Sequence, residues 1–95
     1  MTAELADRIA EVVLTHPSVV SLHGGAYGAV LSYLPGRKVI GVRSTGAGEP
    51  VEVGVVLRIG EPLPDVVSEL RDRVRQVTGA VPVDITVVDV LEPGE

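Results

Sequence analysis

The chain holds two histidines and no cysteine, so disulfides, thiolate metal sites and cysteine nucleophiles are excluded. His16 follows an apolar helical pattern, and His23 precedes a run of glycines. A transition-metal site needs several ligands close together, and no thiolate can contribute one. A Ser-His-Asp arrangement would need a nucleophile elbow or comparable spacing, which this sequence lacks. We therefore predict no catalytic residue, metal site or cofactor, and we expect His16 to cap the first helix.

The glycine cluster at residues 24–28 is the second candidate for chemistry. A phosphate-binding loop needs a helix after its glycines, but residues 29–34 have the pattern of a strand. The same cluster contains a GXXG sequence, Gly25-Ala26-Tyr27-Gly28, as in KH domains. A KH loop joins two helices and carries basic residues in its middle. The context favours a plain turn, and a KH-like nucleic-acid-binding module stays as the alternative function.

Arg71, Arg73 and Arg75 form the densest basic stretch. Within a helix these arginines spread around the axis instead of forming one patch. Glu69 stands four residues before Arg73, which is a favourable spacing for an ion pair. The pattern predicts a solvated face of mixed charge.

The hydrophobic periodicity predicts two helices and five strands. The first helix is expected at 2–15 with Thr2 as its N-cap, and the second at 63–78. A turn at Pro35–Lys38 joins the second and third strands. The strands are expected at 18–23, 29–34, 39–43, 51–59 and 81–90.

The order of these elements predicts an α+β fold. It reads α-β-β-β(-β)-α-β, because the first two strands could form one ribbon or two. Each helix has one apolar face, and strand 51–59 alternates apolar and polar residues. A two-layer sandwich satisfies all three, with a mixed or antiparallel sheet and both helices on one of its faces. We expect a single domain over 1–91 and a short tail at 92–95.

Composition narrows the classes of partner. Lys and Arg total 8 and Asp and Glu total 13, so the net charge is 8 − 13 = −5, which argues against a free-standing nucleic-acid binder. Hydrophobic residues make up 45% of the chain, well above the level of a disordered segment. The first residues are acidic and amphipathic, unlike a secretory signal, and the apolar stretches are too short to span a bilayer. We expect a cytoplasmic protein without direct membrane insertion.

The outward face of the predicted sheet is the candidate interaction surface. Residues that alternate with the predicted core project away from the helices, and several of them are apolar. An apolar outer face favours contact with another protein. The candidate residues are Gly54, Val56, Arg58, Val88 and Val90.

Four stretches of the chain resemble the alkaline shock protein family, also called the envelope stress response family. They are His16-Pro17-Ser18-Val19, the strand from Val51 to Gly60, the helix end at 74–79 and the closing Val87-Val88-Asp89-Val90. The resemblance covers residues 4–91. Ser18 stands where the family usually has Gly, and the long charged C-terminal extension of many members has no counterpart here.

The resemblance implies a non-enzymatic protein that self-associates or binds a scaffold. It implies a homo-oligomer, recruited in some members to the membrane by a small integral-membrane anchor protein. No catalytic residues and no cofactors come with the family. Together with the negative charge, this leads us to expect no nucleic-acid partner.

Overall fold

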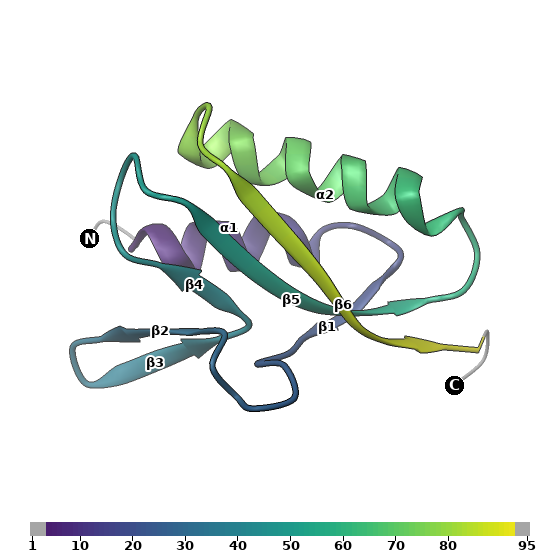
Figure 1. Cartoon of the computed structure of the whole chain (residues 1–95), viewed down its shortest axis with the longest axis horizontal. Coiled ribbons are helices and arrows are strands. Elements are labelled where there is room, and N and C mark those ends of the chain that lie inside the picture. Colours follow the sequence, from purple (N-terminus) through teal and green to yellow (C-terminus); the bar gives the residue numbers. More distant parts are fainter. Residues whose placement is uncertain (1–3, 93–95) are drawn as a thin grey trace.

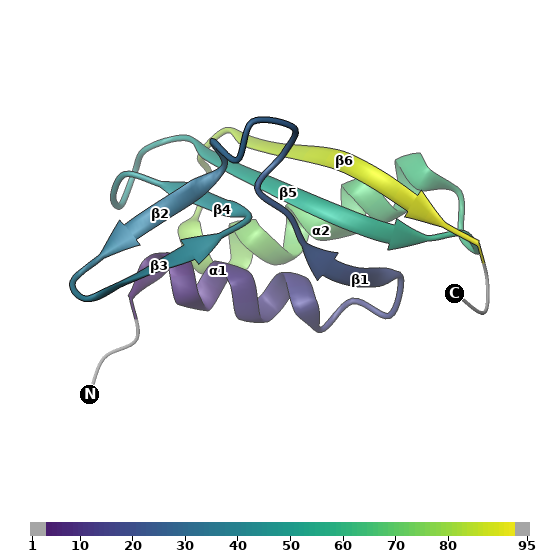
Figure 2. The ribbon, with the colours of Figure 1, turned by 90° about the horizontal axis from the view of Figure 1, so that it is seen from below.

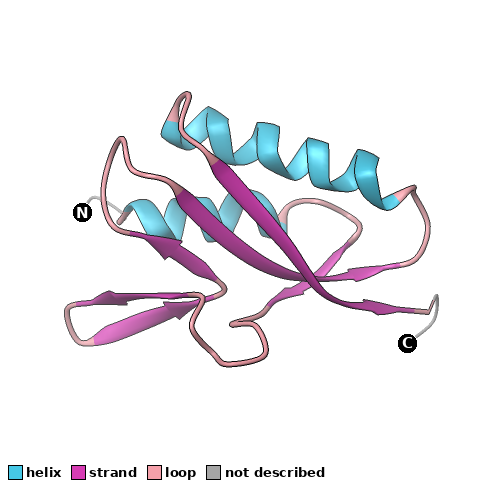
Figure 3. Cartoon of the chain, viewed as in Figure 1, coloured by secondary structure: helices cyan, strands magenta, loops and turns pink. Residues whose placement is uncertain are grey.

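A computed structural model describes residues 4–92 (Figures 1 and 3). The predicted N-cap, Thr2, and residues 93–95 of the predicted tail lie outside this range. The elements in chain order are α1 (Leu5–Leu14), β1 (Val19–Leu22), β2 (Leu31–Leu34), β3 (Arg37–Ile40), β4 (Val42–Ser44), β5 (Val51–Arg58), α2 (Leu63–Thr78) and β6 (Val83–Leu91).

The predicted α+β sandwich is confirmed, with both helices packed on one side of the main sheet. Ile9 and Val13 of α1 and Leu70 and Val74 of α2 are fully buried. They join one apolar cluster with the inward residues of β5, including Val53. Branched aliphatic side chains fill this core, and neither tyrosine belongs to it.

The long central strand β5 organises the main sheet. Strand β6 runs parallel to β5 along one edge. Strands β1 and β4 are both antiparallel to β5 and share its other edge. The sheet is therefore mixed, which is one of the two arrangements that the sequence predicted.

Strands β1 and β4 are two halves of one edge strand. Strand β1 pairs with the end of β5 and β4 with its beginning, and the two meet at Gly54. The Gly54 carbonyl accepts the N–H of His23 at 2.8 Å, and its N–H donates to the carbonyl of Gly41 at 2.9 Å. Residues 23–41, which we call the excursion, leave the edge at His23 and rejoin it at Gly41. Its first part arches over the side of the sheet turned away from α1 (Figure 2).

Two glycines make this junction possible. Gly41 has φ +93°, and a Cβ there would lie 2.6 Å from the Cβ of Leu22. A Cβ on Gly54 would overlap the carbonyl oxygen of His23. The predicted continuous strand 39–43 is wrong for this reason, since Gly41 breaks it into β3 and β4.

The rest of the excursion is the β2–β3 hairpin. Its turn is the two residues Pro35 and Gly36, so the prediction of a turn through Lys38 was too long. The Ser32 hydroxyl fastens β2 to β4, because it donates to the carbonyl of Val42 at 2.7 Å and accepts the N–H of Ser44 at 3.0 Å.

A bulge in β6 changes which residues face outward. Val55 pairs with Val87, but the next pair is Val56 with Asp89, so Val88 is an extra residue. Val90 consequently pairs with Leu57, a fully buried core residue. Because cross-strand partners share a face, the prediction that Val90 lies on the outer face is wrong.

Val74 offers a direct test of this core, because it is fully buried on α2. We expect Val74→Ala to lower the free energy of unfolding by about 1–3 kcal/mol, through lost burial and a residual cavity. Val74→Asp should abolish folding, because it buries an unpaired charge. Urea denaturation checks both, with the exposed Gln76→Ala as control. A Val74→Asp variant as stable as the wild type would place this helix face in solvent.

Gly54 and Gly60 form a matched pair for testing the junction. Gly54→Ala should cost about 1–3 kcal/mol, because the new methyl group must displace the His23 carbonyl. Gly60→Ala meets no atom within 4 Å and should change stability by less than about 0.5 kcal/mol. Urea denaturation of the two variants compares them directly, and equal stabilities would contradict the close approach at Gly54.

Candidate functional site

The structure removes three residues from the predicted interaction face. Gly54 is buried beneath the His23 carbonyl, so the approach that it allows is made by the chain itself. Val56 is only 8% exposed, although it lies outside the core cluster. Val90 lies on the helix-facing side for the reason given above. The outer face is therefore less apolar than its sequence pattern suggested.

Two of the predicted residues keep an accessible position. Val88 lies at the bulge and is partly exposed, with a methyl group near Gly54. Arg58 is exposed and donates to the carbonyl of Pro17 at 3.1 Å. Asp89, also exposed, follows Val88 on the same strand. We call Arg58, Val88 and Asp89 the bulge patch.

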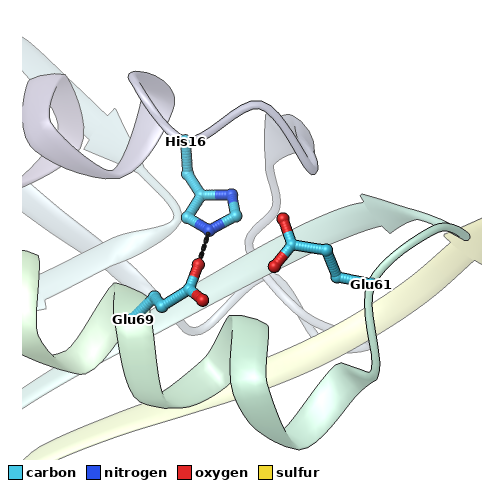
Figure 4. Close-up of side chains that lie close together, drawn as sticks. All are labelled: His16, Glu61 and Glu69. Atoms are coloured by element: carbon cyan, nitrogen blue, oxygen red, sulfur yellow. Dashed lines mark hydrogen bonds and ion pairs between the residues drawn. The ribbon is translucent and has the colours of Figure 1, made fainter.

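His16 takes a role different from the predicted helix cap. Its side chain is 1% exposed, and its Nε2 lies 2.6 Å from a carboxylate oxygen of Glu69 on α2 (Figure 4). Its Nδ1 accepts the N–H of Ser18 at 3.0 Å. An amide donor at Nδ1 leaves the ring proton on Nε2, which donates it to Glu69. His16 thus ties the turn after α1 to the middle of α2.

His16, Glu61 and Glu69 bring three potential ligand atoms within 4.8 Å of one another. Figure 4 shows both carboxylates directed toward the imidazole. A metal-bound imidazole normally donates its other ring N–H to an acceptor. Here the other nitrogen, Nδ1, already accepts an amide proton from Ser18. The donor set is therefore poorly suited to a divalent ion, and the cluster is better explained as a structural link.

The arginines of α2 bond to backbone and hydroxyl oxygens of the chain. Arg71 donates to the carbonyl of Val83 at 3.1 Å, and Arg75 to that of Val81 at 3.3 Å. Arg73 donates to the hydroxyl of Thr15 at 2.7 Å. The predicted Glu69–Arg73 pair is wrong, because Glu69 contacts His16 instead.

The excursion exposes both aromatic residues of the chain. Tyr27 of the GXXG turn is 98% exposed, and Tyr33 of β2 is 81% exposed. The hairpin register places Tyr33 beside Lys38, and Leu31 beside Ile40, on the face opposite Ser32. Ile40 is itself 51% exposed. Exposed tyrosines next to apolar side chains are typical of binding surfaces.

A cleft runs between β2 and β4, with a volume of about 550 Å³. Tyr33 and Leu31 form one wall, and Arg43 lies on the other. Arg43 is exposed, with only a distant contact to Glu52 at 3.9 Å. The remaining lining residues are Gly28, Ala29, Ser32, Ser44 and Thr45.

Sequence reasoning missed this cleft, although the chain carries a signal for it. No Asp or Glu occurs in residues 12–48, which hold three basic residues and both tyrosines. The other residues hold 8 − 3 = 5 basic and 13 acidic residues, a net charge of −8. The net charge of −5 is the sum of +3 and −8, so it conceals the difference between the two regions.

One ion pair attaches the hairpin to the acidic part of the chain. Arg37 donates to Asp7 of α1 through two nitrogens, one of them at 2.7 Å. The hydrogen bond from Arg37 holds the pKa of the Asp7 carboxyl below its ordinary value. Arg37 is therefore neutralised locally, and Lys38 of the excursion and Arg43 of β4 carry the accessible positive charge of this region.

Comparisons with protein-family models, curated proteins and solved structures found no match to this chain. The resemblance to the alkaline shock protein family therefore stays a prediction. Within residues 4–92, neither helix is long and apolar enough to cross a bilayer.

We expect His16→Leu to lower the free energy of unfolding by about 1–3 kcal/mol, because the Ser18 N–H is left buried without an acceptor. Glu69→Gln keeps an oxygen for Nε2–H and should cost less than about 1 kcal/mol, since Glu69 is half exposed. Urea denaturation measures both. A thermal shift with Zn²⁺ completes the test: a higher unfolding temperature, lost in His16→Leu, would contradict the structural role.

Proposed function

We propose that this protein is a non-enzymatic domain that self-associates or binds a scaffold protein through its sheet. The observation that carries the proposal is the one-sided packing of the sheet. Both helices bury their apolar stripes against the same face, so the bulge patch and the outer edge of β6 are left for a partner. Homo-oligomers commonly form through such self-complementary surfaces.

The β6 edge favours a short contact over a long strand pairing. In this parallel ladder the Pro82 carbonyl accepts the N–H of Val51, so alternate residues direct their backbone groups outward. Arg71 already covers the outward carbonyl of Val83, and the Asp89 carboxylate accepts the N–H of Val90 at 2.8 Å. These contacts protect both ends of the edge. The open stretch is the middle of β6, next to Val88.

The hydrogen bonds of the two histidines support a non-enzymatic role. His16 bonds to a carboxylate and to a backbone amide, and His23 accepts the N–H of Gly25 at 2.9 Å. In residues 4–92, neither ring is hydrogen-bonded to a hydroxyl group. A histidine that activates a serine or threonine lies within hydrogen-bond reach of the hydroxyl in the reacting complex, and the bonds seen here favour structural roles for both rings.

The proposal includes the biology that the family resemblance implies. The protein would act in cell-envelope homeostasis or the envelope stress response, in the cytoplasm. A small integral-membrane anchor would bring it to the membrane through protein contacts. The net charge of −5 and the placement of the GXXG turn between β1 and β2 support this function over a KH-like module.

Sedimentation velocity tests self-association at protein concentrations up to about 300 μM, enough to populate an interface with a Kd of order 100 μM. We expect dimers or larger species that increase with concentration. Val88→Lys should weaken them while the circular dichroism spectrum stays unchanged, because it adds a charge to the bulge patch.

Ser68→Lys is the matched control, because Ser68 is exposed on α2, away from the outer face of the sheet. It should associate like the wild type. A wild-type protein that stays monomeric throughout would remove the support for self-association. Equal weakening by both lysine variants would indicate a general charge effect and not a contact at Val88.

A further inference from the structure

We propose that the cleft between β2 and β4 binds an extended acidic segment of another protein. This site is separate from the bulge patch. A negative result for peptide binding can therefore be distinguished from a negative result for self-association. Three observations carry the proposal: the positive charge of residues 12–48, the residues that line the cleft, and the unpaired backbone edge of β2.

The charge of the excursion and its flanking residues favours a negatively charged ligand. Residues 12–48 have a net charge of +3 and no carboxylate, within a chain whose other residues carry −8. Arg43 lines the cleft, and Lys38 is exposed beside Tyr33 on the neighbouring strand. Lys38 makes no ion pair within residues 4–92, and the contact of Arg43 with Glu52 is 3.9 Å long. Both cations are therefore available to carboxylates of a ligand.

The shape of the cleft fits a chain with alternating side chains. Leu31 and Tyr33 are two residues apart on β2, so they present apolar surface at the spacing of an extended peptide. Arg43 lies across the cleft from this wall. Apolar side chains of the ligand would pack on Leu31 and Tyr33, and its carboxylates would meet Arg43. A volume of about 550 Å³ accommodates several side chains at once.

The β2 backbone adds hydrogen bonds that do not depend on the ligand's sequence. Gly41 donates its N–H to Val30, which makes Ser32 and Val39 a hydrogen-bonded pair in the hairpin. The N–H and C=O of Tyr33 therefore point away from β3, at the edge of β2 that is not paired in the hairpin. On β4, the Val42 carbonyl and the Ser44 N–H are already hydrogen-bonded to the Ser32 hydroxyl. A ligand strand would thus pair with β2, the mode known as β-augmentation.

The small number of free cations favours a peptide over a polymeric anion. Because Arg37 is paired with Asp7, Lys38 of the excursion and Arg43 of β4 are the accessible cations of this region. Nucleic-acid and membrane-surface binding both rest on many charge contacts. A short acidic peptide needs few, and it gains from the apolar wall and the backbone edge.

The probe for the experiment is a fluorescein-labelled ten-residue peptide of alternating Glu and Leu. We expect saturable binding to the full chain by fluorescence anisotropy. A peptide of alternating Gln and Leu should bind roughly tenfold more weakly, because it lacks the charges that meet Lys38 and Arg43.

Four variants locate the site in matched pairs. Arg43→Gln and Tyr33→Ser should each weaken binding by roughly fivefold to tenfold. Arg8→Gln, an exposed arginine on α1, and Tyr27→Ser, a tyrosine outside the cleft lining, should bind like the wild type. Val88→Lys should also leave peptide binding unchanged, which keeps this site distinct from the bulge patch. Circular dichroism verifies the fold of each variant.

Several outcomes would overturn the proposal. They are equal affinity for the Glu and Gln peptides, equal losses from Arg43→Gln and Arg8→Gln, or no binding at about 300 μM protein. Tighter binding of an oligouridine, or of phosphatidylglycerol vesicles, than of the acidic peptide would instead assign the excursion to nucleic acid or to a lipid surface.

Discussion

The backbone contact at Gly54 is the constraint on which the rest of the structure depends. A buried peptide group must find hydrogen-bond partners, and Gly54 obtains them from His23 and Gly41. These partners are 18 residues apart in the chain, so the two halves of one edge strand come from both ends of the excursion. A side chain at Gly54 would prevent the His23 carbonyl from lying over the strand. The hairpin, the exposed tyrosines and the cleft all follow from this detour.

The polar contacts beneath the sheet complement the valine-rich core. Branched aliphatic side chains fill the space between β5 and the helices, but they have no directional bonds that fix how α1 and α2 meet. His16–Glu69 and Arg73–Thr15 supply such bonds at the end of α1. Both ring nitrogens of His16 are used in hydrogen bonds within the fold, one to Glu69 and one to Ser18. Its burial is thus explained without any catalytic role.

Local sequence signals predicted the elements well and their junctions poorly. Helix 63–78 matches its predicted range, because Pro64 near its start and Gly79 after its end are strong local signals. The inward residues of β5 also agree with the alternation. Three features depend on partners distant in sequence: the break at Gly41, the bulge at Val88 and the bond from His16 to Glu69. Alternation cannot indicate a bulge, because one extra residue reverses every face after it. For that reason the alternation predicts the wrong side for Val90, whereas Gly54 and Val56 leave the candidate interaction face because they are buried.

The division of charge along the chain places the two proposed surfaces in different electrostatic surroundings. At physiological salt the Debye length is about 8 Å, whereas the protein extends over 36 × 26 × 24 Å. A ligand at the cleft therefore interacts mainly with Lys38 and Arg43 and with the nearest carboxylates, Glu4 and Glu52, and carboxylates farther away are largely screened. At low salt the whole charge of −5 acts at longer range and opposes the approach of any polyanion. A protein with this net charge is therefore best suited to partners that bind through a few charge contacts and through close apolar packing. The exposed Tyr33 beside two cations offers such contacts, and so does the bulge patch, where Val88 is followed by Asp89 and then by Arg58 along the ladder.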